Sequence, residues 1–386
     1  MEKWKEYKIG NICSNVCSGG TPSSKHAEYY DGDIPWLNTK EINFNRIYNT
    51  AKCITEEGLN NSSAKWIAEN SVIVAMYGAT AGKAAIAKIP LTTNQACCNL
   101  TIDPTIADYR FVYYFLCYKF IELASLANGG AQQNLNAQII KDFDIVLPSL
   151  KEQTHIANLL SSFDDKIEVN RRINDNLEQQ AQALFKSWLS LCKDEVTIGD
   201  LSMNITDYTK CDQKQVVLIN SSDVTEGYFM HHNLSKKENL KGHFKKRFTK
   251  GDILYSQVRP RNRHWGYCTF DAENYLASTQ LMVIRNKKDI VPSILLYQYL
   301  IDDNVWMDFT LKTETRSGTF PQGNYEDLSS VKIPFGADVN DISMKLKSLY
   351  ALLFYNEDES RRLASLRDTL LPRLMSGEIK VEDVTL

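Results

Sequence analysis

The stretch MYGATAGKAAI, residues 76–86, has the residue types of a phosphate-binding loop, with two glycines and a lysine behind an apolar strand. A Walker A loop has the spacing GxxxxGK followed by Ser or Thr, because its amides wrap the phosphates and its hydroxyl binds magnesium. Here Gly78 to Lys83 is one residue too short, and Ala84 follows the lysine. The spacing therefore argues against a nucleotide site and predicts a tight turn after a core strand.

A second group of candidate functional side chains, which are basic, lies between Lys241 and Trp265. Eight Lys or Arg residues occur there against one acid, Asp252, although the whole chain has a formal net charge of −3. A local excess of positive charge in a slightly acidic protein is typical of a surface that binds phosphates. A solvated basic loop is the alternative interpretation of the same residues.

The composition excludes several other classes of protein. A chain of 386 residues with 43% hydrophobic and 24% charged residues is typical of a soluble protein with two domains. No stretch approaches the roughly 20 apolar residues of a membrane span, and MEKWKEYKIG lacks the apolar core of a secretory signal. We therefore expect a cytoplasmic protein without membrane contact. The nine cysteines and six histidines show no metal-ligand spacing, so buried thiols are expected and a zinc site is not.

The elements that position these residues occur twice along the chain. Recurrence at a constant offset, here about 187 residues, indicates an internal duplication. The paired motifs are YKIGNICS and VTIGDLSM, TNQACCNLTI and ASTQLMVI, and the segments 129–148 and 317–336.

Each copy begins with a strand-rich region. SVIVAMY and GDILYSQV are apolar strands at corresponding places, so the turn at Gly78 and the arginine-rich loop after Tyr255 are diverged copies of one loop. Equivalent loops with different side chains are what two recognition modules for two different targets would show.

Each copy ends in a long helix. Between Ser149 and Leu189 there is neither glycine nor proline, and apolar residues recur in two heptad rows. The second copy repeats this pattern, so the two helices are expected to pack as a coiled coil. In the first helix one row is Ile156, Phe163, Leu177 and Leu184, and the other is Leu160, Ile167, Ala181 and Trp188. In the second helix one row is Ile342, Leu349, Leu363 and Leu370, and the other is Leu346 and Leu353.

One polar residue interrupts the same row in each helix. Asn170 and Asn356 take positions where an apolar side chain would otherwise stand, as Asn174 and Ser360 do in the other row. If the helices pack antiparallel, their middles face each other, and an Asn170–Asn356 contact can fix the register at a cost in stability. Two solvent-facing asparagines are the alternative.

Several motifs together resemble the specificity subunits of type I DNA restriction-modification enzymes. They are SGGTPS, IPWLNTKEI, GATAGKAAI, TNQACCNL, LPSLKEQTHIANLLSSFDDKIEVNRRINDNLEQQAQALFKSWL and SLRDTLLPRLMSGEI. Their order and the twofold repeat carry the resemblance, which covers nearly the whole chain.

The resemblance implies an α+β fold of two similar α/β target recognition domains. A pseudo-twofold axis would relate them, and two long helices forming an antiparallel coiled coil would separate them. The expected division is residues 1–148 for the first domain, 149–192 for the first helix, 193–335 for the second domain and 336–386 for the second helix and tail.

The resemblance also implies a function without catalysis in this chain. It implies binding of double-stranded DNA and docking of two methyltransferase subunits, through which restriction and translocase subunits join. S-adenosylmethionine, ATP and magnesium are expected on those partners and no cofactor on this chain. In agreement, the chain has no DPPY or NPPY tetrapeptide, since DPTI at Asp103 lacks the aromatic residue that stacks on a flipped base.

Candidate DNA contacts are the loop residues that can hold phosphates or bond to base edges. In the first domain these are Thr21, Asn38, Thr39, Lys40, Tyr77, Thr80, Lys83, Gln132, Gln133 and Asn134. In the second they are Ser221, Lys245, Lys246, Arg247, Gln257, Arg259, Arg261, Arg263, Arg316 and Gln322.

Gln95 and Gln280 occupy matching places inside apolar strands. Either can bond to a base, but we expect buried amides that tie the fold together. The segment DYRFVYYFLCY at 108–118 is expected to form a buried helix.

Helix length limits the DNA target. About 40 residues at 1.5 Å each give a separator of roughly 60 Å, so two different half-sites are expected within about two turns of DNA.

A coiled-coil scaffold with peptide-binding modules is the alternative function.

Overall fold

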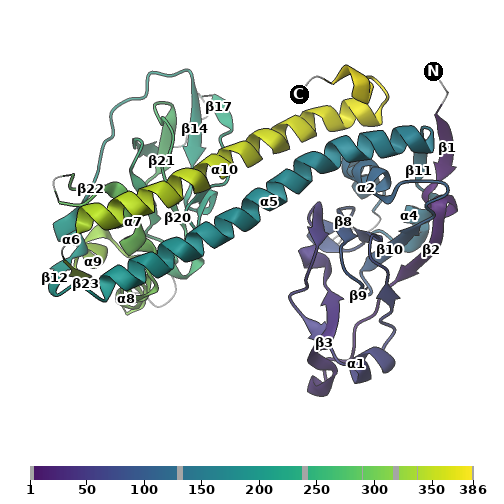
Figure 1. The fold of residues 1–386 in the computed structure, drawn as a ribbon, viewed down its shortest axis with the longest axis horizontal. Coiled ribbons are helices and arrows are strands. Elements are labelled where there is room, and N and C mark those ends of the chain that lie inside the picture. The colour runs from purple at the N-terminus through teal and green to yellow at the C-terminus, as the bar shows by residue number, and fades with distance from the viewer. Residues whose placement is uncertain are drawn as a thin grey trace. The chain divides into compact units, whose positions relative to one another are not determined.

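The computed structural model describes residues 4–127, 134–236, 242–288, 290–315, 321–336 and 338–384. The chain forms two compact units. Unit 1 consists of Met1–Val169 and Glu359–Leu386, and unit 2 of Asn170–Asp358. Each unit contains one strand-rich region and part of both long helices, which are drawn with their labels in Figure 1.

The described residues of unit 1 form two sheets and a short two-stranded ribbon. The five-stranded sheet has the order β2 (Cys13–Ser18), β10 (Cys97–Ile102), β7 (Val72–Ala75), β8 (Ala84–Ala87), β4 (Asn45–Ile47). The four-stranded sheet has the order β5 (Cys53–Ile54), β3 (Tyr30–Leu37), β9 (Leu91–Thr93), β6 (Trp66–Ile67), and the ribbon pairs β1 (Lys5–Lys8) with β11 (Asp144–Leu147). The α-helices of this region are α1 (Glu56–Asn60), α2 (Tyr109–Tyr118), α3 (Phe120–Ser125) and α4 (Ala137–Asp142).

Unit 2 repeats this plan with four strands in each of its two sheets. The first has the order β13 (Ser202–Asn204), β22 (Leu281–Asn286), β19 (Ile253–Ser256), β20 (Trp265–Tyr267), and the second β17 (Leu234–Lys236), β14 (Gln215–Ile219), β21 (Tyr275–Ser278), β18 (Phe244–Lys246). Two ribbons pair β12 (Asp194–Thr197) with β23 (Lys332–Phe335) and β15 (Val224–Thr225) with β16 (Tyr228–Phe229). The α-helices are α6 (Ile198–Leu201), α7 (Ser293–Ile301), α8 (Asp303–Glu314) and α9 (Tyr325–Ser329).

The two units share their topology. The order β2-β10-β7-β8 corresponds to β13-β22-β19-β20, and the parallel pair β3·β9 corresponds to β14·β21. The same chain order of corresponding elements agrees with the internal repeat in the sequence.

Strand β7 shows why these sequences fold into layers. All four residues of its VIVA sequence are buried, which is usual for a strand covered on both faces. Because side chains alternate along a strand, Val72 and Val74 join one hydrophobic core with α2, while Ile73 and Ala75 join another with Leu37. Unit 1 therefore has one core beneath its helices and a second core on the opposite face of the same sheet.

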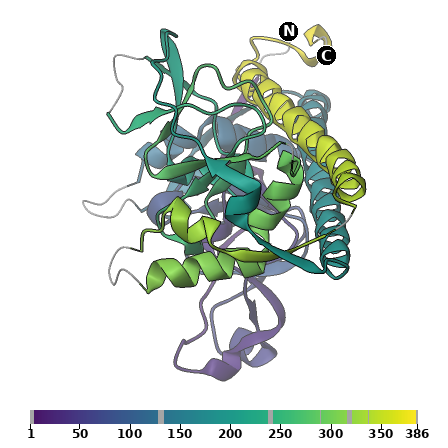
Figure 2. The ribbon, with the colours of Figure 1, turned by 90° about the vertical axis from the view of Figure 1, so that its left-hand side faces the viewer.

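The long helices are α5 (Leu150–Leu189) and α10 (Val339–Met375), which Figures 1 and 2 show as continuous helices. Every residue of the predicted heptad rows is buried or partly buried. The mixed helix and sheet fold with long helices is confirmed. The buried helix predicted in DYRFVYYFLCY is also confirmed, since six residues of α2 are buried.

In unit 2 the predicted asparagines lie together between the helices. Asn170 donates from Nδ2 to the Asn356 carbonyl at 3.2 Å, and Asn174 donates to the Leu353 carbonyl at 3.1 Å. Asn356 donates from its own amide to Asn174 Oδ1 at 2.9 Å. Higher numbers on α5 pair with lower numbers on α10, so these segments run antiparallel. The contact involves three asparagines, whereas the sequence suggested a direct pair.

In unit 1 the helices are joined by charges. Arg367 of α10 forms an ion pair with Asp164 of α5, and Lys166 Nζ lies 3.2 Å from Glu359 Oε2. This pairing is also antiparallel. None of the described helices is long and apolar enough to cross a bilayer.

Candidate nucleic-acid interface

One corner of each unit is formed where the chain passes from one sheet into the other. In unit 1 the turn after β9 leads into β10, and in unit 2 the turn after β21 leads into β22. Gln95 and Gln280 lie in these turns and are exposed. The expectation of buried amides inside strands was wrong, because each apolar segment is two strands joined by a short turn.

The unit 1 corner gathers loops that are distant in sequence. Asn94 donates its backbone N–H to the Leu37 carbonyl at 3.0 Å, which places the turn beside Asn38. On its other side, Met76 donates to the Ala96 carbonyl at 2.8 Å, which brings in Tyr77. Asn134 forms a β-bridge with Tyr77, and the Thr21 hydroxyl donates to the Gln95 side-chain oxygen. The predicted residues Thr21, Asn38, Tyr77 and Asn134 therefore surround Gln95.

The unit 2 corner has the same construction. Ile219 is the register partner of Ala277, which places the residues after β14 beside the turn at Gln280. Gln257 donates its backbone N–H to the Gln280 carbonyl at 2.9 Å and accepts from the Gly323 N–H at 2.9 Å. Gln322 bridges to Val258, and Ser221 Oγ donates to Gln280 Oε1 at 3.4 Å. Ser221, Gln257 and Gln322 thus lie around Gln280.

Matching caps rigidify both corners. Asn38 caps the 3-10 turn Thr39–Glu41, and Asn220 caps the 3-10 turn Ser221–Asp223, each within a capping box. The Asn38 side-chain oxygen accepts from the Lys40 N–H at 3.1 Å, and Thr39 is buried. Lys40 is exposed at this turn. Asn38 and Thr39 therefore build the corner, while Lys40 projects from it.

The glycine turn of unit 1 has the expected form. Gly78 and Gly82 have φ values of +70° and +85°, which glycine adopts without steric cost. Lys83 Nζ donates to Asn43 Oδ1 at 2.7 Å, and Thr80 donates to the Tyr77 carbonyl at 3.5 Å. The turn joins the adjacent antiparallel strands β7 and β8.

The corresponding loop of unit 2 is held by carboxylates. Arg261 forms two hydrogen bonds with Glu314, one of them from Nη2 to Oε2 at 2.7 Å. Arg263 donates to Asp303 at 2.8 Å and lies 4.3 Å from the centre of the Trp306 ring. Arg259 and Arg263 have φ values of +49° and +52°, a left-handed backbone conformation that residues other than glycine rarely adopt. Backbone strain and ion pairs together fix the course of this loop.

Lys246 does not have the surroundings expected of a phosphate ligand. It is only 5% exposed, and its Nζ donates to the carbonyls of Leu281 at 2.6 Å and Thr279 at 3.3 Å. Burial lowers the pKa of this ammonium, as does the neighbouring Lys245. Lys246 therefore supports the turn on both sides of Gln280, and its assignment as a DNA contact is corrected to a structural role.

Other predicted contacts have varied surroundings. Lys245 is exposed, with Nζ 5.0 Å from the centre of the Tyr208 ring, and Arg247 is partly buried. Gln132, Gln133 and Arg316 lie outside the described residues.

Comparison with known proteins decides the family. The model of the type I restriction modification DNA specificity domain matches residues 1–179 and 193–340. This chain belongs to that family. The MjaIX specificity subunit of Methanocaldococcus jannaschii is 26% identical to it, with 99% of this chain and 94% of the relative covered. The HindI specificity subunit of Haemophilus influenzae is 38% identical over 142 residues, which are 36% of this chain and 30% of the relative.

A solved structure agrees with the fold of this specificity-domain protein. It is the type I restriction-modification S subunit from M. genitalium, with a TM-score of 0.59 and 18% identity, and 96% of each chain is covered.

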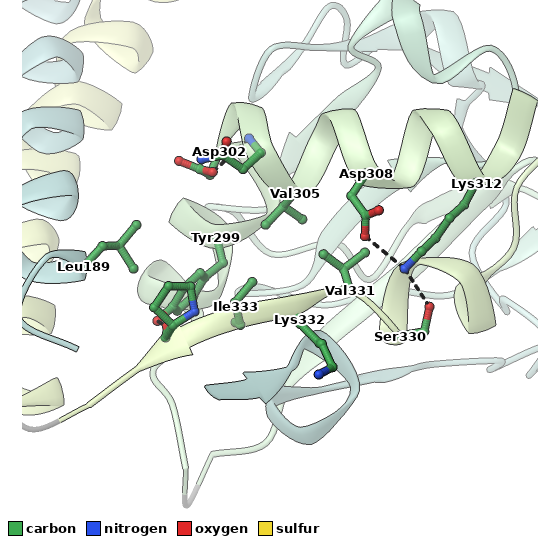
Figure 3. A pocket seen from close by; sticks show the side chains of 12 residues that line it. Leu189, Tyr299, Asp302, Val305, Asp308, Lys312, Ser330, Val331, Lys332 and Ile333 are labelled. Atoms are coloured by element: carbon green, nitrogen blue, oxygen red, sulfur yellow. Dashed lines mark hydrogen bonds and ion pairs between the residues drawn. The ribbon is translucent and has the colours of Figure 1, made fainter. Parts of the chain in front are cut away.

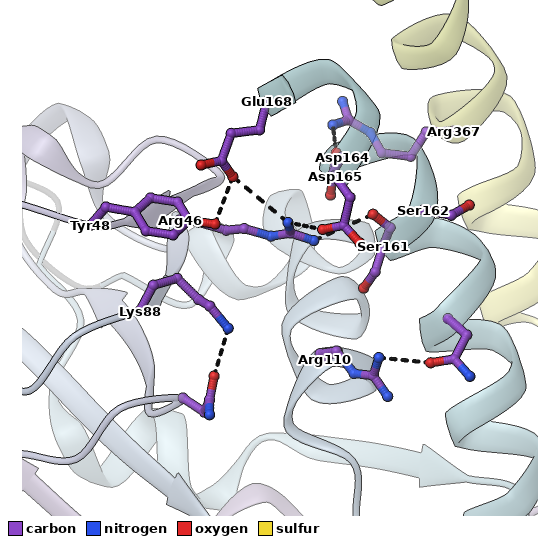
Figure 4. A network of polar contacts seen from close by, with 12 residues as sticks. Arg46, Tyr48, Lys88, Arg110, Ser161, Ser162, Asp164, Asp165, Glu168 and Arg367 are labelled. Atoms are coloured by element: carbon purple, nitrogen blue, oxygen red, sulfur yellow. Dashed lines mark hydrogen bonds and ion pairs between the residues drawn. The ribbon is translucent and has the colours of Figure 1, made fainter. Parts of the chain in front are cut away.

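In this specificity-domain protein a polar network attaches the unit 1 sheets to α5 (Figure 4). Arg46 of β4 forms an ion pair with Asp165, and the Tyr48 hydroxyl donates to Glu168 at 2.7 Å. Arg110 of α2 donates to Asn158 at 2.7 Å. These contacts attach the part of unit 1 that carries the corner to α5. Sequence reasoning missed them, because nothing in the local pattern links residues 48 to 120 positions apart.

Two cavities in the specificity-domain protein are lined by residues other than those of the two corners. A cavity of about 400 Å³ in unit 2 is lined by Leu189, Val305 and Ile333 and bordered by Lys312, which contacts Asp308 and Ser330 (Figure 3). A cavity of about 990 Å³ in unit 1 is lined by α2, α3, β11 and the chain after α10. Within the described ranges, no group of three His, Cys, Asp or Glu side chains is arranged to hold a metal ion.

Proposed function

We propose that this chain binds a bipartite, asymmetric DNA sequence, with one half-site on each unit, as the specificity subunit of a type I restriction-modification enzyme. The observation that carries this proposal is the repeated corner, where exposed or partly exposed amide and hydroxyl side chains from several loops lie beside a turn. Amides and hydroxyls recognise base edges, and cations and backbone N–H groups hold phosphates.

The two corners differ in the side chains that they present. The bridged pair is Tyr77 and Asn134 in unit 1 but Val258 and Gln322 in unit 2, and the arginine-rich loop occurs in unit 2. One backbone plan with different side chains supports different half-sites. Because arginine pairs with guanine in two hydrogen bonds, the unit 2 half-site should contain more guanine contacts.

The long helices supply the spacing and the surface for partners. A helix of 40 residues is about 60 Å long, which suits half-sites within about two turns of DNA. Met344, Leu352 and Tyr355 are exposed on α10 and recur at helical spacing. This apolar surface suits the docking of two methyltransferase subunits, which would carry S-adenosylmethionine and through which restriction subunits with ATP and magnesium would join. The chain itself would have no catalytic role.

Mapping of methylated DNA tests this function. Cells that express the methyltransferase subunits with this chain should show a split methylated motif, which disappears when the chain is deleted. Persistence of the motif after deletion would contradict the proposal.

Salt dependence separates DNA recognition from peptide binding by a scaffold. Binding of the complex to a duplex that contains the motif should weaken steeply between low and physiological salt, because bound phosphates release counterions. A scaffold with peptide-binding modules would show no preference for the motif at any salt concentration.

A further inference from the structure

We propose that Gln95 and Gln280 are base-contacting residues, each selecting an adenine in its own half-site. This inference rests on the proposed function and adds the residues and the base. Neither glutamine was among the DNA contacts expected from the sequence.

The first argument is position. Each glutamine is exposed in the turn that passes between two sheets, and the loops before and after it approach from both sides. In unit 1 the flanking residues Asn94 and Ala96 are bonded to the backbone at Leu37 and Met76. Gln280 itself is bonded through its carbonyl to Gln257 in unit 2. A side chain at the centre of converging loops is well placed to contact a base edge.

The second argument is orientation. A hydroxyl donates to the amide oxygen in both units, from Thr21 to Gln95 and from Ser221 to Gln280. The two hydroxyls come from unrelated places in the chain, since Thr21 precedes β3 and Ser221 follows β14. A hydroxyl therefore contacts a turn glutamine in each unit. In both units the amide oxygen faces the hydroxyl.

The third argument is the remaining bonding capacity. An amide oxygen has two lone pairs, and one hydroxyl uses one of them. Among the described residues, no partner is recorded for the amide nitrogen of Gln95 or Gln280. One acceptor site and a donor group then remain on each glutamine. Adenine presents the complementary pair in the major groove, an N6 donor beside the N7 acceptor.

The fourth argument is that the backbone is held without the glutamine side chains. Lys246 bonds to the carbonyls of Thr279 and Leu281, on both sides of Gln280. In unit 1 the Asn94 side chain accepts from the Ala96 N–H at 3.1 Å, across Gln95. A side chain that the turn does not need for its own stability is free to serve recognition.

Alanine substitutions in the full complex test the inference. Gln95→Ala and Gln280→Ala should each reduce the preference for adenine at one position, by about 5- to 150-fold. The two affected positions should lie in different half-sites, and the rest of the methylated motif should be unchanged. An unchanged motif in both variants, or the same position affected by both, would overturn the proposal.

Two other glutamines provide matched controls. Gln138 in α4 and Gln215 at the far end of β14 are exposed glutamines of unit 1 and unit 2. Gln138→Ala and Gln215→Ala should leave the motif as it is. Thermal unfolding of all four variants should match the parent chain, because the replaced side chains are exposed.

A second measurement applies if either variant no longer methylates DNA. Duplexes in which one adenine is replaced by 7-deazaadenine lack the N7 acceptor but keep base pairing. The complex should bind such a duplex about 5- to 150-fold more weakly at the contacted adenine, and the matching alanine variant should show no further loss. If the 7-deazaadenine and alanine substitutions weaken binding independently at every adenine, so that their effects add, the inference is overturned.

These outcomes separate the inference from the proposed function. If the parent complex produces no split motif, the proposed function fails. If the parent motif is split but the alanine variants and 7-deazaadenine duplexes show no coupling, only the assignment of Gln95 and Gln280 fails.

Discussion

At the scale of single residues, neighbours in space decide what a polar side chain does. Lys246 belongs to a basic run but is buried against two carbonyls, whereas Gln95 lies in an apolar segment but is exposed. Residue type and local pattern predicted the opposite in both cases. A lysine stem can be buried in an apolar environment, and a turn without glycine or proline resembles a continuous strand in sequence.

Thr21 provides a test of positioning at this scale. Thr21→Val removes the hydroxyl that orients Gln95, so the preference for adenine in that half-site should fall, but less than in Gln95→Ala. Thr21→Ser keeps the hydroxyl and should restore the preference. The readout is the methylated motif. Equal motifs for the valine and serine variants would show that the hydroxyl has no such role.

Glu314 provides a test of electrostatics. Its hydrogen bonds with Arg261 lower the pKa of this carboxyl group, so it is ionised at neutral pH and neutralises the arginine. Glu314→Gln should release one positive charge toward DNA. The slope of log K against log salt should then become steeper by about 0.9 if one more phosphate is bound. Asp341→Asn on α10, whose carboxylate pairs with Lys345, is a control that should leave the slope unchanged.

At the scale of elements, the long helices were the most predictable part of the fold. The segment without glycine or proline begins at Ser149, and α5 extends from Leu150 to Leu189. A heptad pattern specifies a helix through local spacing, which sequence displays directly. The corners were less predictable, because they depend on strand pairs such as β3·β9 and β14·β21 that join distant segments.

The asparagine cluster between the helices gives a prediction about register. Asn356→Leu alone leaves the Asn174 side-chain oxygen without the bond it accepts, which should cost about 1–3 kcal/mol of stability. Replacing Asn170, Asn174 and Asn356 together by leucine removes the buried polar groups as a set. The triple variant should therefore melt at a higher temperature than the parent while losing specificity of register. A triple variant that melts below Asn356→Leu would contradict this account.

At the scale of the whole molecule, the duplication explains how one chain presents two recognition surfaces. Both units share the order of four strands in one sheet and have capped corners, and each takes in part of both long helices. The repeat was visible in the sequence because motifs recur at nearly constant offset. The extent of the compact units was not, because it depends on packing between segments at opposite ends of the chain.

Exchange of segments tests this modular plan. Replacing residues 193–335 by the corresponding segment of a relative with a different motif should change one half of the methylated sequence and leave the other half as it was. The changed half should be the one that loses its adenine preference in Gln280→Ala. A change in both halves would contradict independent recognition by the two units.

The way the corner turns are held has an evolutionary consequence. Because Lys246 and Asn94 fix the backbone, the exposed side chain between their contacts can change without loss of folding stability. Single nucleotide changes in the codon of Gln95 or Gln280 could then give proteins with new DNA preferences that still fold and assemble. Selection can thus act on target choice alone, and descendants of one ancestor can diverge in sequence preference faster than in architecture.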